Sequence, residues 1–90
     1  MTKIEGLTKI TAIIPTFNEE SNIEKALESV QFADEVIVID SYSTDNTIDI
    51  VKKSSAKLLQ REFDNFSNQK NYAISKATND WIFLLDADEV

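Results

Sequence analysis

The sequence contains no cysteine and no histidine, and it has only one glycine and one proline among its 90 residues. The absence of cysteine excludes disulfides and zinc–thiolate sites, which fits a reducing compartment. The absence of histidine excludes a serine–histidine triad and a histidine-ligated metal. The single glycine, Gly6, precedes the first predicted strand. The sequence therefore has neither a dinucleotide-binding GxGxxG loop nor a P-loop.

Basic residues are also scarce, since nine lysines and arginines stand against sixteen aspartates and glutamates, a formal net charge of -7. Such a charge argues against nucleic acid or anionic lipid as a partner. No segment approaches the roughly 18–20 consecutive apolar residues that span a bilayer, and residues 1–11 lack the apolar core of a signal peptide. We therefore expect no transmembrane segment, and a location in the cytoplasm or at the inner face of the cell membrane.

What the sequence does contain is an alternation of strand and helix patterns after a flexible lead-in at residues 1–8. Short apolar runs such as 35–40 are typical of buried parallel strands, whereas residues 23–30 place apolar side chains at helix spacing. The predicted strands are 9–16, 35–40, 56–61 and 81–85, and the predicted helices are 19–31, 47–55 and 67–77. This order predicts an α/β fold, with one domain over residues 1–90 and an open, mostly parallel Rossmann-like sheet of about four strands and three helices.

Three details of these elements follow from single residues. Pro15 cannot donate a hydrogen bond to a sheet, so we expect it to mark the end of the first strand. Asn18 and Ser43 are residue types that favour N-caps, so we expect them to cap the first two helices. Each assignment places a polar segment directly after a strand.

Polar clusters follow three of the predicted strands, at residues 15–19, 40–45 and 86–89. Taken singly, each cluster would serve as a helix cap or a solvated turn. In an open parallel sheet, however, ligands bind outside the carboxyl ends of the strands, and all three clusters lie at such ends. Their coincidence at one edge favours a ligand site.

The acidic segment Asp86-Ala87-Asp88-Glu89 predicts a divalent cation at this edge. Carboxylate oxygens suit hard cations such as Mg²⁺ or Mn²⁺. Residues two apart in an extended chain lie roughly 6–7 Å apart, too far for both to ligate one octahedral ion without a bend. We therefore assign Asp88 to the metal and Asp86 to water or a ligand hydroxyl. Lys70 is the basic residue best suited to phosphate, although a solvated helical lysine fits the pattern equally well.

Three motifs carry a resemblance to a known family: Ile13-Ile14-Pro15-Thr16-Phe17-Asn18-Glu19, Val38-Ile39-Asp40-Ser41-Tyr42-Ser43-Thr44-Asp45 and Leu85-Asp86-Ala87-Asp88-Glu89. Together they resemble the nucleotide-sugar half of family 2 glycosyltransferases, which implies the N-terminal half of a GT-A fold. Many family members have an aspartate and a glycine where this chain has Ser41 and Tyr42. The Asp-Ser pair, with Gln69-Lys70, is similar to the subgroup that builds bacterial lipopolysaccharide cores and related surface glycans.

The resemblance also implies roles for individual residues. Pro15, Thr16 and Phe17 would line the uracil or other base, Glu19 would lie close by, and Asp40 would accept a hydrogen bond from the base edge. Lys70 would approach the nucleotide, Asp86 would reach the ribose, and Asp88 would bind Mg²⁺ or Mn²⁺ on the diphosphate. The implied partners are a nucleoside diphosphate sugar, with a UDP-sugar favoured, and a glycan or lipid-linked acceptor.

The family's inverting reaction uses a carboxylate general base that lies well beyond the DxD motif. This chain has no residues in that region, so we assign no catalytic base. We expect these 90 residues to bind a nucleotide but not to transfer sugar. A receiver-like signalling module also gathers aspartates and a lysine at strand ends, but it needs paired acids after the first strand. A ligand-free assembly fragment is a further alternative, and an uncovered sheet edge predicts a homo-oligomer.

Overall fold

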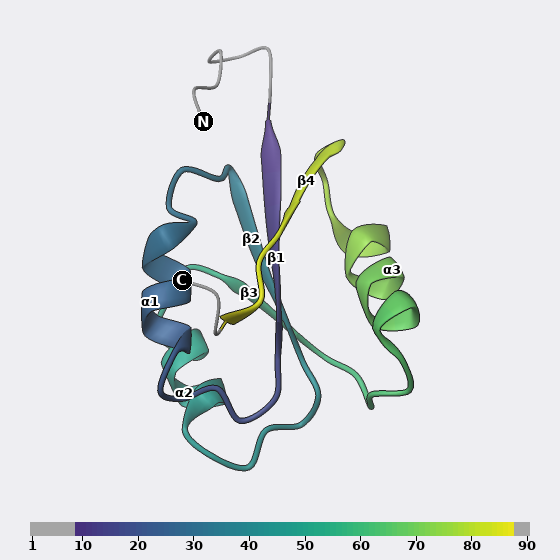
Figure 1. Ribbon diagram of the computed structural model, residues 1–90. Coiled ribbons are helices and arrows are strands. Elements are labelled where there is room, and N and C mark those ends of the chain that lie inside the picture. The colour runs from purple at the N-terminus through teal and green to yellow at the C-terminus, as the bar shows by residue number, and fades with distance from the viewer. Residues whose placement is uncertain (1–8, 88–90) are drawn as a thin grey trace.

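The structure, a computed structural model, describes residues 9–87 of the chain (Figure 1). Its strands are β1 (Ile10–Thr16), β2 (Glu35–Asp40), β3 (Lys57–Gln60) and β4 (Trp81–Leu84), and its helices are α1 (Ile23–Ser29), α2 (Thr47–Lys52) and α3 (Phe66–Lys76). The strands form one sheet in the order β3-β2-β1-β4, and every neighbouring pair is parallel. The predicted open α/β sheet of four strands and three helices is confirmed.

Helices cover both faces of this sheet, with α1 and α2 on one side and α3 on the other (Figure 1). Ala12, Ile14 and Val38 point to the first face, where they pack against α1 and α2. Ile13 and Ile37 point to the opposite face, toward α3. Because the two central strands are buried on both faces, their sequences are mostly apolar rather than alternating.

β1 ends at Thr16, as predicted, but Pro15 is not its last residue, because Pro15 pairs in register with Ile39 of β2. The Thr16 carbonyl accepts a hydrogen bond from Ser41, and the Ile13 carbonyl accepts one from Leu85. Since backbone N–H and C=O groups alternate in direction along a strand, the backbone nitrogen of Pro15 faces the same side as that of Ile13, toward β4. The register of β4 ends opposite Ile13, so the missing N–H of Pro15 costs no sheet hydrogen bond.

The two predicted N-caps are also wrong. Asn18 has a positive φ of 52°, a left-handed conformation that asparagine tolerates, and α1 begins only at Ile23. Ser43 lies before Asn46, which precedes the first residue of α2, and Asp45 accepts the backbone N–H of Thr47 instead. Both predicted caps hold neighbouring loops together, because strand-end loops compete for the same short polar side chains that cap helices.

The outer strand β4 leaves apolar side chains uncovered. Trp81 is 65% exposed and Leu84 44% exposed, and Phe83 meets Phe32 edge to face with ring centroids 5.5 Å apart. β4 is an edge strand, with β1 as its only neighbour in the described part of the chain. No helix within residues 9–87 is long and apolar enough to cross a bilayer.

Candidate functional site

A pocket of about 600 Å³ opens at the carboxyl edge of the sheet. Segments from four parts of the chain form it: the end of β1, the residue after β2, the region around the start of α3, and the residues after β4. Its lining consists of Pro15, Thr16, Phe17, Glu19, Ser41, Phe63, Phe66, Gln69, Asp86 and Ala87. The volume lies within the range of roughly 300–1,000 Å³ that small-molecule sites occupy.

Five of the site residues predicted from the sequence meet in this pocket: Pro15, Thr16, Phe17, Glu19 and Asp86. Their meeting follows from topology, because parallel strands bring their carboxyl ends to one edge. Phe17 is 59% exposed and Asp86 is exposed, so both are open to a ligand. Their ligand contacts stay predictions.

Asp40 lies beneath the pocket rather than in its lining. Its side chain is fully buried and accepts three hydrogen bonds. Oδ1 accepts the Thr16 hydroxyl at 2.6 Å and the Ser43 hydroxyl, and Oδ2 accepts the Ser43 backbone N–H at 2.7 Å. Asp40 therefore fixes Thr16, which does line the pocket, and its direct contact with a base stays a prediction.

The loops after β1 and β2 are tied to each other. The Asn18 side-chain oxygen accepts the backbone N–H of Thr44 at 2.7 Å and that of Asp45 at 3.3 Å. In the opposite direction, the Asn18 backbone N–H donates to the Ser43 hydroxyl at 2.8 Å, and the Glu19 backbone N–H donates to the Thr47 hydroxyl at 2.8 Å. These bonds preorganise the floor of the pocket before any ligand arrives.

On α3 the residue that lines the pocket is Gln69, not Lys70. Gln69 is 2% exposed, whereas Lys70 is partly buried and lies outside the pocket lining. The helical period gives the reason, because Gln69 lies one turn before the fully buried Ala73 and shares its face. Sequence reasoning missed Gln69 by looking for a charge, although this spacing could have found it.

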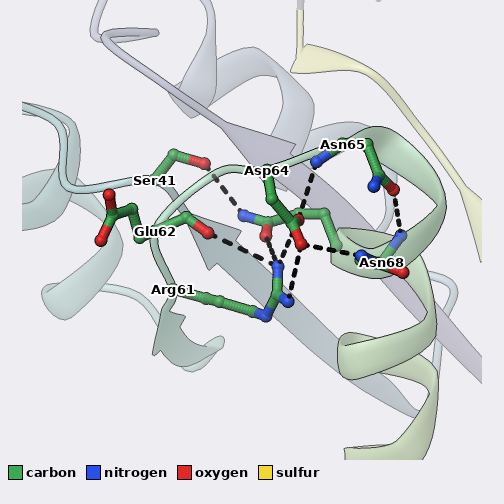
Figure 2. Close-up of polar contacts among 7 residues, drawn as sticks. Ser41, Arg61, Glu62, Asp64, Asn65 and Asn68 are labelled. Carbon is green, nitrogen blue, oxygen red and sulfur yellow. Dashed lines mark hydrogen bonds and ion pairs between the residues drawn. The ribbon is translucent and has the colours of Figure 1, made fainter.

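Figure 2 shows the polar network around Arg61, to which Ser41, Asp64 and Asn68 belong. The Arg61 guanidinium donates to the Gln69 side-chain oxygen at 3.0 Å, and the Gln69 amide nitrogen donates to the Ser41 hydroxyl oxygen at 2.9 Å. Arg61 also binds both carboxylate oxygens of Asp64, at 2.9 and 3.4 Å. The Arg61 hydrogen bond, with help from Asn68, holds the pKa of Asp64 well below its usual range. Ser41, after β2, is thereby linked to the segment after β3.

Two further aromatic rings, Phe63 and Phe66, line the pocket. They meet edge to face with centroids 5.2 Å apart, and they are 47% and 64% exposed. The Tyr72 ring, also on α3, packs against the apolar cluster beneath that helix. The pocket thus presents Phe17, Phe63 and Phe66 to a ligand, which suits a planar ring.

Asp88, the predicted metal ligand, lies outside the described residues. Within residues 9–87, no group of three or more histidine, cysteine, aspartate or glutamate side chains is placed to hold a metal. Of the neighbouring carboxylates, Asp86 lines the pocket. Mg²⁺ typically takes one or two carboxylates and completes its shell with water and substrate phosphates, so an acidic segment at this end of the pocket fits such an ion.

The model of the family described as "Glycosyl transferase family 2" matches residues 11–90. The chain belongs to this family. An uncharacterized glycosyltransferase of Rickettsia typhi is 43% identical over 84 residues, which cover 92% of this chain and 29% of the relative. The SPbeta prophage-derived glycosyltransferase SunS of Bacillus subtilis is 41% identical over 85 residues, which cover 90% of this chain and 20% of SunS. The chain thus spans less than a third of the length of these relatives.

A solved structure shares the fold. Glucosyl-3-phosphoglycerate synthase from Mycobacterium tuberculosis, in complex with Mn²⁺, UDP-glucose and glycerol 3-phosphate, superposes with a TM-score of 0.80 at 25% identity. The match covers 92% of this chain and 35% of that protein. The family membership gives no support to a receiver-like module, and the complete burial of Asp40 is unlike an accessible phosphorylation site.

Proposed function

We propose that this chain binds the nucleoside diphosphate of a sugar donor, with a UDP-sugar favoured, as the donor-binding part of an inverting glycosyltransferase. The observation that carries the proposal is the pocket itself, which combines three exposed aromatic rings with the carboxylates Glu19 and Asp86. Family membership supports it, and so does the fold shared with a synthase that binds Mn²⁺ and UDP-glucose. In this proposal the described residues bind the donor, and none of them is assigned as the catalytic base.

The electrostatics of the pocket make a cation part of this proposal. Glu19 and Asp86 line the pocket, and the sequence carries a formal charge of -7, so a bare diphosphate would be repelled. Mg²⁺ or Mn²⁺ held by Asp88, with Asp86 beside it toward the ribose, would neutralise the diphosphate as it becomes the leaving group. The residues of the chain bind and orient the nucleotide around that charge. Lys70, partly buried on α3, is assigned to approach the nucleotide.

The acceptor class belongs to the same proposal. The Asp40-Ser41 pair and the Gln69-Lys70 pair are similar to the subgroup that builds lipopolysaccharide cores and related surface glycans. Ser41 and Gln69, one from each pair, are joined by a hydrogen bond at the pocket. This link supports treating the two pairs as parts of one site, and a glycan or lipid-linked glycan of the bacterial surface is the acceptor that we assign.

The test is calorimetric titration of the 90-residue chain with UDP, with and without Mn²⁺. We expect binding with Mn²⁺ and a loss of at least tenfold in affinity without it, or in Asp88→Ala. Asp80→Ala is the matched control, because Asp80 is an exposed acid before β4, at the opposite end of that strand. No UDP binding under any condition would refute the nucleotide site, and equal binding with and without metal would refute the metal.

A further inference from the structure

The hydrogen-bond directions around Gln69 are fixed by chemistry. Arginine has only donors, so the atom of the Gln69 amide that faces Arg61 must be its oxygen, and the two lie 3.0 Å apart. The amide nitrogen must then face Ser41, whose hydroxyl oxygen accepts its hydrogen at 2.9 Å. Asp64 holds Arg61 in place through two hydrogen bonds (Figure 2). The direction of each hydrogen bond from Arg61 through Gln69 to Ser41 therefore follows from the charge of Arg61.

This leaves two hydrogens at the pocket without a partner. Ser41 accepts from Gln69, so its own O–H remains to donate, and it has no acceptor among the described residues. The amide nitrogen of Gln69 carries a second hydrogen that likewise has no acceptor within residues 9–87. Ser41 and Gln69 both line the pocket. This end of the site therefore offers donors, and it suits an acceptor atom on the ligand.

The order of the strands shows which part of a nucleotide meets these donors. Asp86 follows β4 and Ser41 follows β2, and β1 lies between those strands. At a strand spacing of about 4.8 Å, the two positions are on the order of 10 Å apart along the edge of the sheet. The proposed function puts the diphosphate and its metal at the Asp86 end, which leaves the base at the end of Ser41 and Gln69.

We propose that Ser41 and Gln69 select the nucleobase by donating hydrogen bonds to a ring carbonyl, with Arg61 as the positioning residue that sets the direction of those bonds. The proposal rests on the proposed function and specifies its base. Uracil and guanine carry an exocyclic carbonyl where cytosine and adenine carry an amino group. A carbonyl accepts from the two donors, whereas an amino group would set donor against donor and leave desolvated hydrogens unpaired.

The experiment compares the dissociation constants of UDP and CDP, and of GDP and ADP, at saturating Mn²⁺. We expect the wild-type chain to prefer the keto base of each pair by about tenfold or more, and Ser41→Ala to lower that preference to within about threefold. Gln69→Glu is a more stringent test of the bond directions than Ser41→Ala. A carboxylate still accepts from Arg61 but forces the Ser41 hydrogen toward itself, so the preference should vanish or reverse. Asn71→Asp, which adds the same charge at an exposed position of α3, is the control and should keep the wild-type preference.

Arg61 lies outside the pocket lining, so its variants test positioning without touching the base. Arg61→Leu allows the Gln69 amide to rotate so that its oxygen and nitrogen exchange places, and the preference for the keto base should fall severalfold. Arg61→Lys retains a donor facing the amide oxygen, and it should restore most of the preference. Equal binding of UDP and CDP by the wild type, or an unchanged preference in Gln69→Glu, would overturn this inference while leaving the nucleotide site intact. Failure of UDP to bind at all would refute the proposed function instead.

Discussion

The buried carboxylate of Asp40 provides the clearest test of how the pocket floor is held. The replacement Asp40→Asn keeps the shape of the side chain and removes its charge. In the structure this side chain is completely buried and accepts hydrogen bonds from the Thr16 hydroxyl, the Ser43 hydroxyl and the Ser43 backbone N–H. An asparagine offers one acceptor oxygen and an NH₂ group, so it cannot accept all three donors as the carboxylate does.

The expected loss can be worked out bond by bond. A hydrogen bond to a charged group contributes about 1.5–3 kcal/mol net, and a neutral one about 0.5–1.5 kcal/mol. Each of the three bonds therefore loses about 1 kcal/mol when the acceptor becomes neutral, which gives about 3 kcal/mol in total. That is a large share of the roughly 5–15 kcal/mol by which domains are stable.

Urea unfolding followed by circular dichroism measures this loss. With a slope of about 1.5 kcal/mol per molar urea for a domain this small, the midpoint should fall by about 2 M. Thr16→Val removes one of the three donors at constant shape, and should cost about half as much as Asp40→Asn. Asp80→Asn makes the same chemical change at an exposed site, and should shift the free energy of unfolding by less than about 0.5 kcal/mol. If Asp40→Asn and Asp80→Asn unfold at the same midpoint, the reasoning is wrong.

Three further predictions concern the rim and the edge of the fold. Because Arg61 lowers the pKa of Asp64, the contact between the two side chains stabilises the fold above the unfolded pKa near 3.8, and this contribution is lost as pH falls below that value. Carbon-detected NMR should show a higher pKa for Asp64 in Arg61→Leu. Phe66→Ala should weaken UDP binding by roughly tenfold with little change in stability, since Phe66 is 64% exposed; calorimetry and urea unfolding check both. Sedimentation should show self-association through β4 that Trp81→Arg reduces, and a monomer at high concentration would contradict this.

The fold was largely predictable because its strands and helices carry strong and different periods. Residues 35–40 were predicted as a strand and form β2 with the same bounds, because both faces of that strand are covered and its apolar run is unbroken. Helix boundaries were less predictable. Residues 19–22 carry an acidic first turn suited to a helix, yet α1 begins at Ile23, since Asn18 takes a left-handed conformation to bind the neighbouring loop. Tertiary hydrogen bonds there outweigh the local preference.

The site was predictable where it depends on topology and less so where it depends on side-chain packing. Glu19 and Asp86 could be placed at one edge of the sheet because parallel strands end there. Ser41 and Gln69 received no role, because nothing in the sequence shows that residues 28 positions apart share a hydrogen bond. Lys70 attracted notice for its charge, but the helical period turns its neighbour Gln69 inward. Charge alone is a weak guide to which face of a helix meets a ligand.

The two ends of the pocket differ in how completely the protein itself builds them. At the β2 end, Ser41, Gln69 and Arg61 hold one another in a directed set of hydrogen bonds that needs no ligand. At the β4 end, Asp86 is exposed and makes no hydrogen bond to another described residue, so its order must come from what binds there. A cation and a diphosphate would supply most of the binding energy at the second end, because they compensate charge. The first end contributes fixed hydrogen-bond donors, and folding has already ordered them before the ligand binds. Affinity and base selectivity are therefore separable properties of this site, located at opposite ends of one pocket.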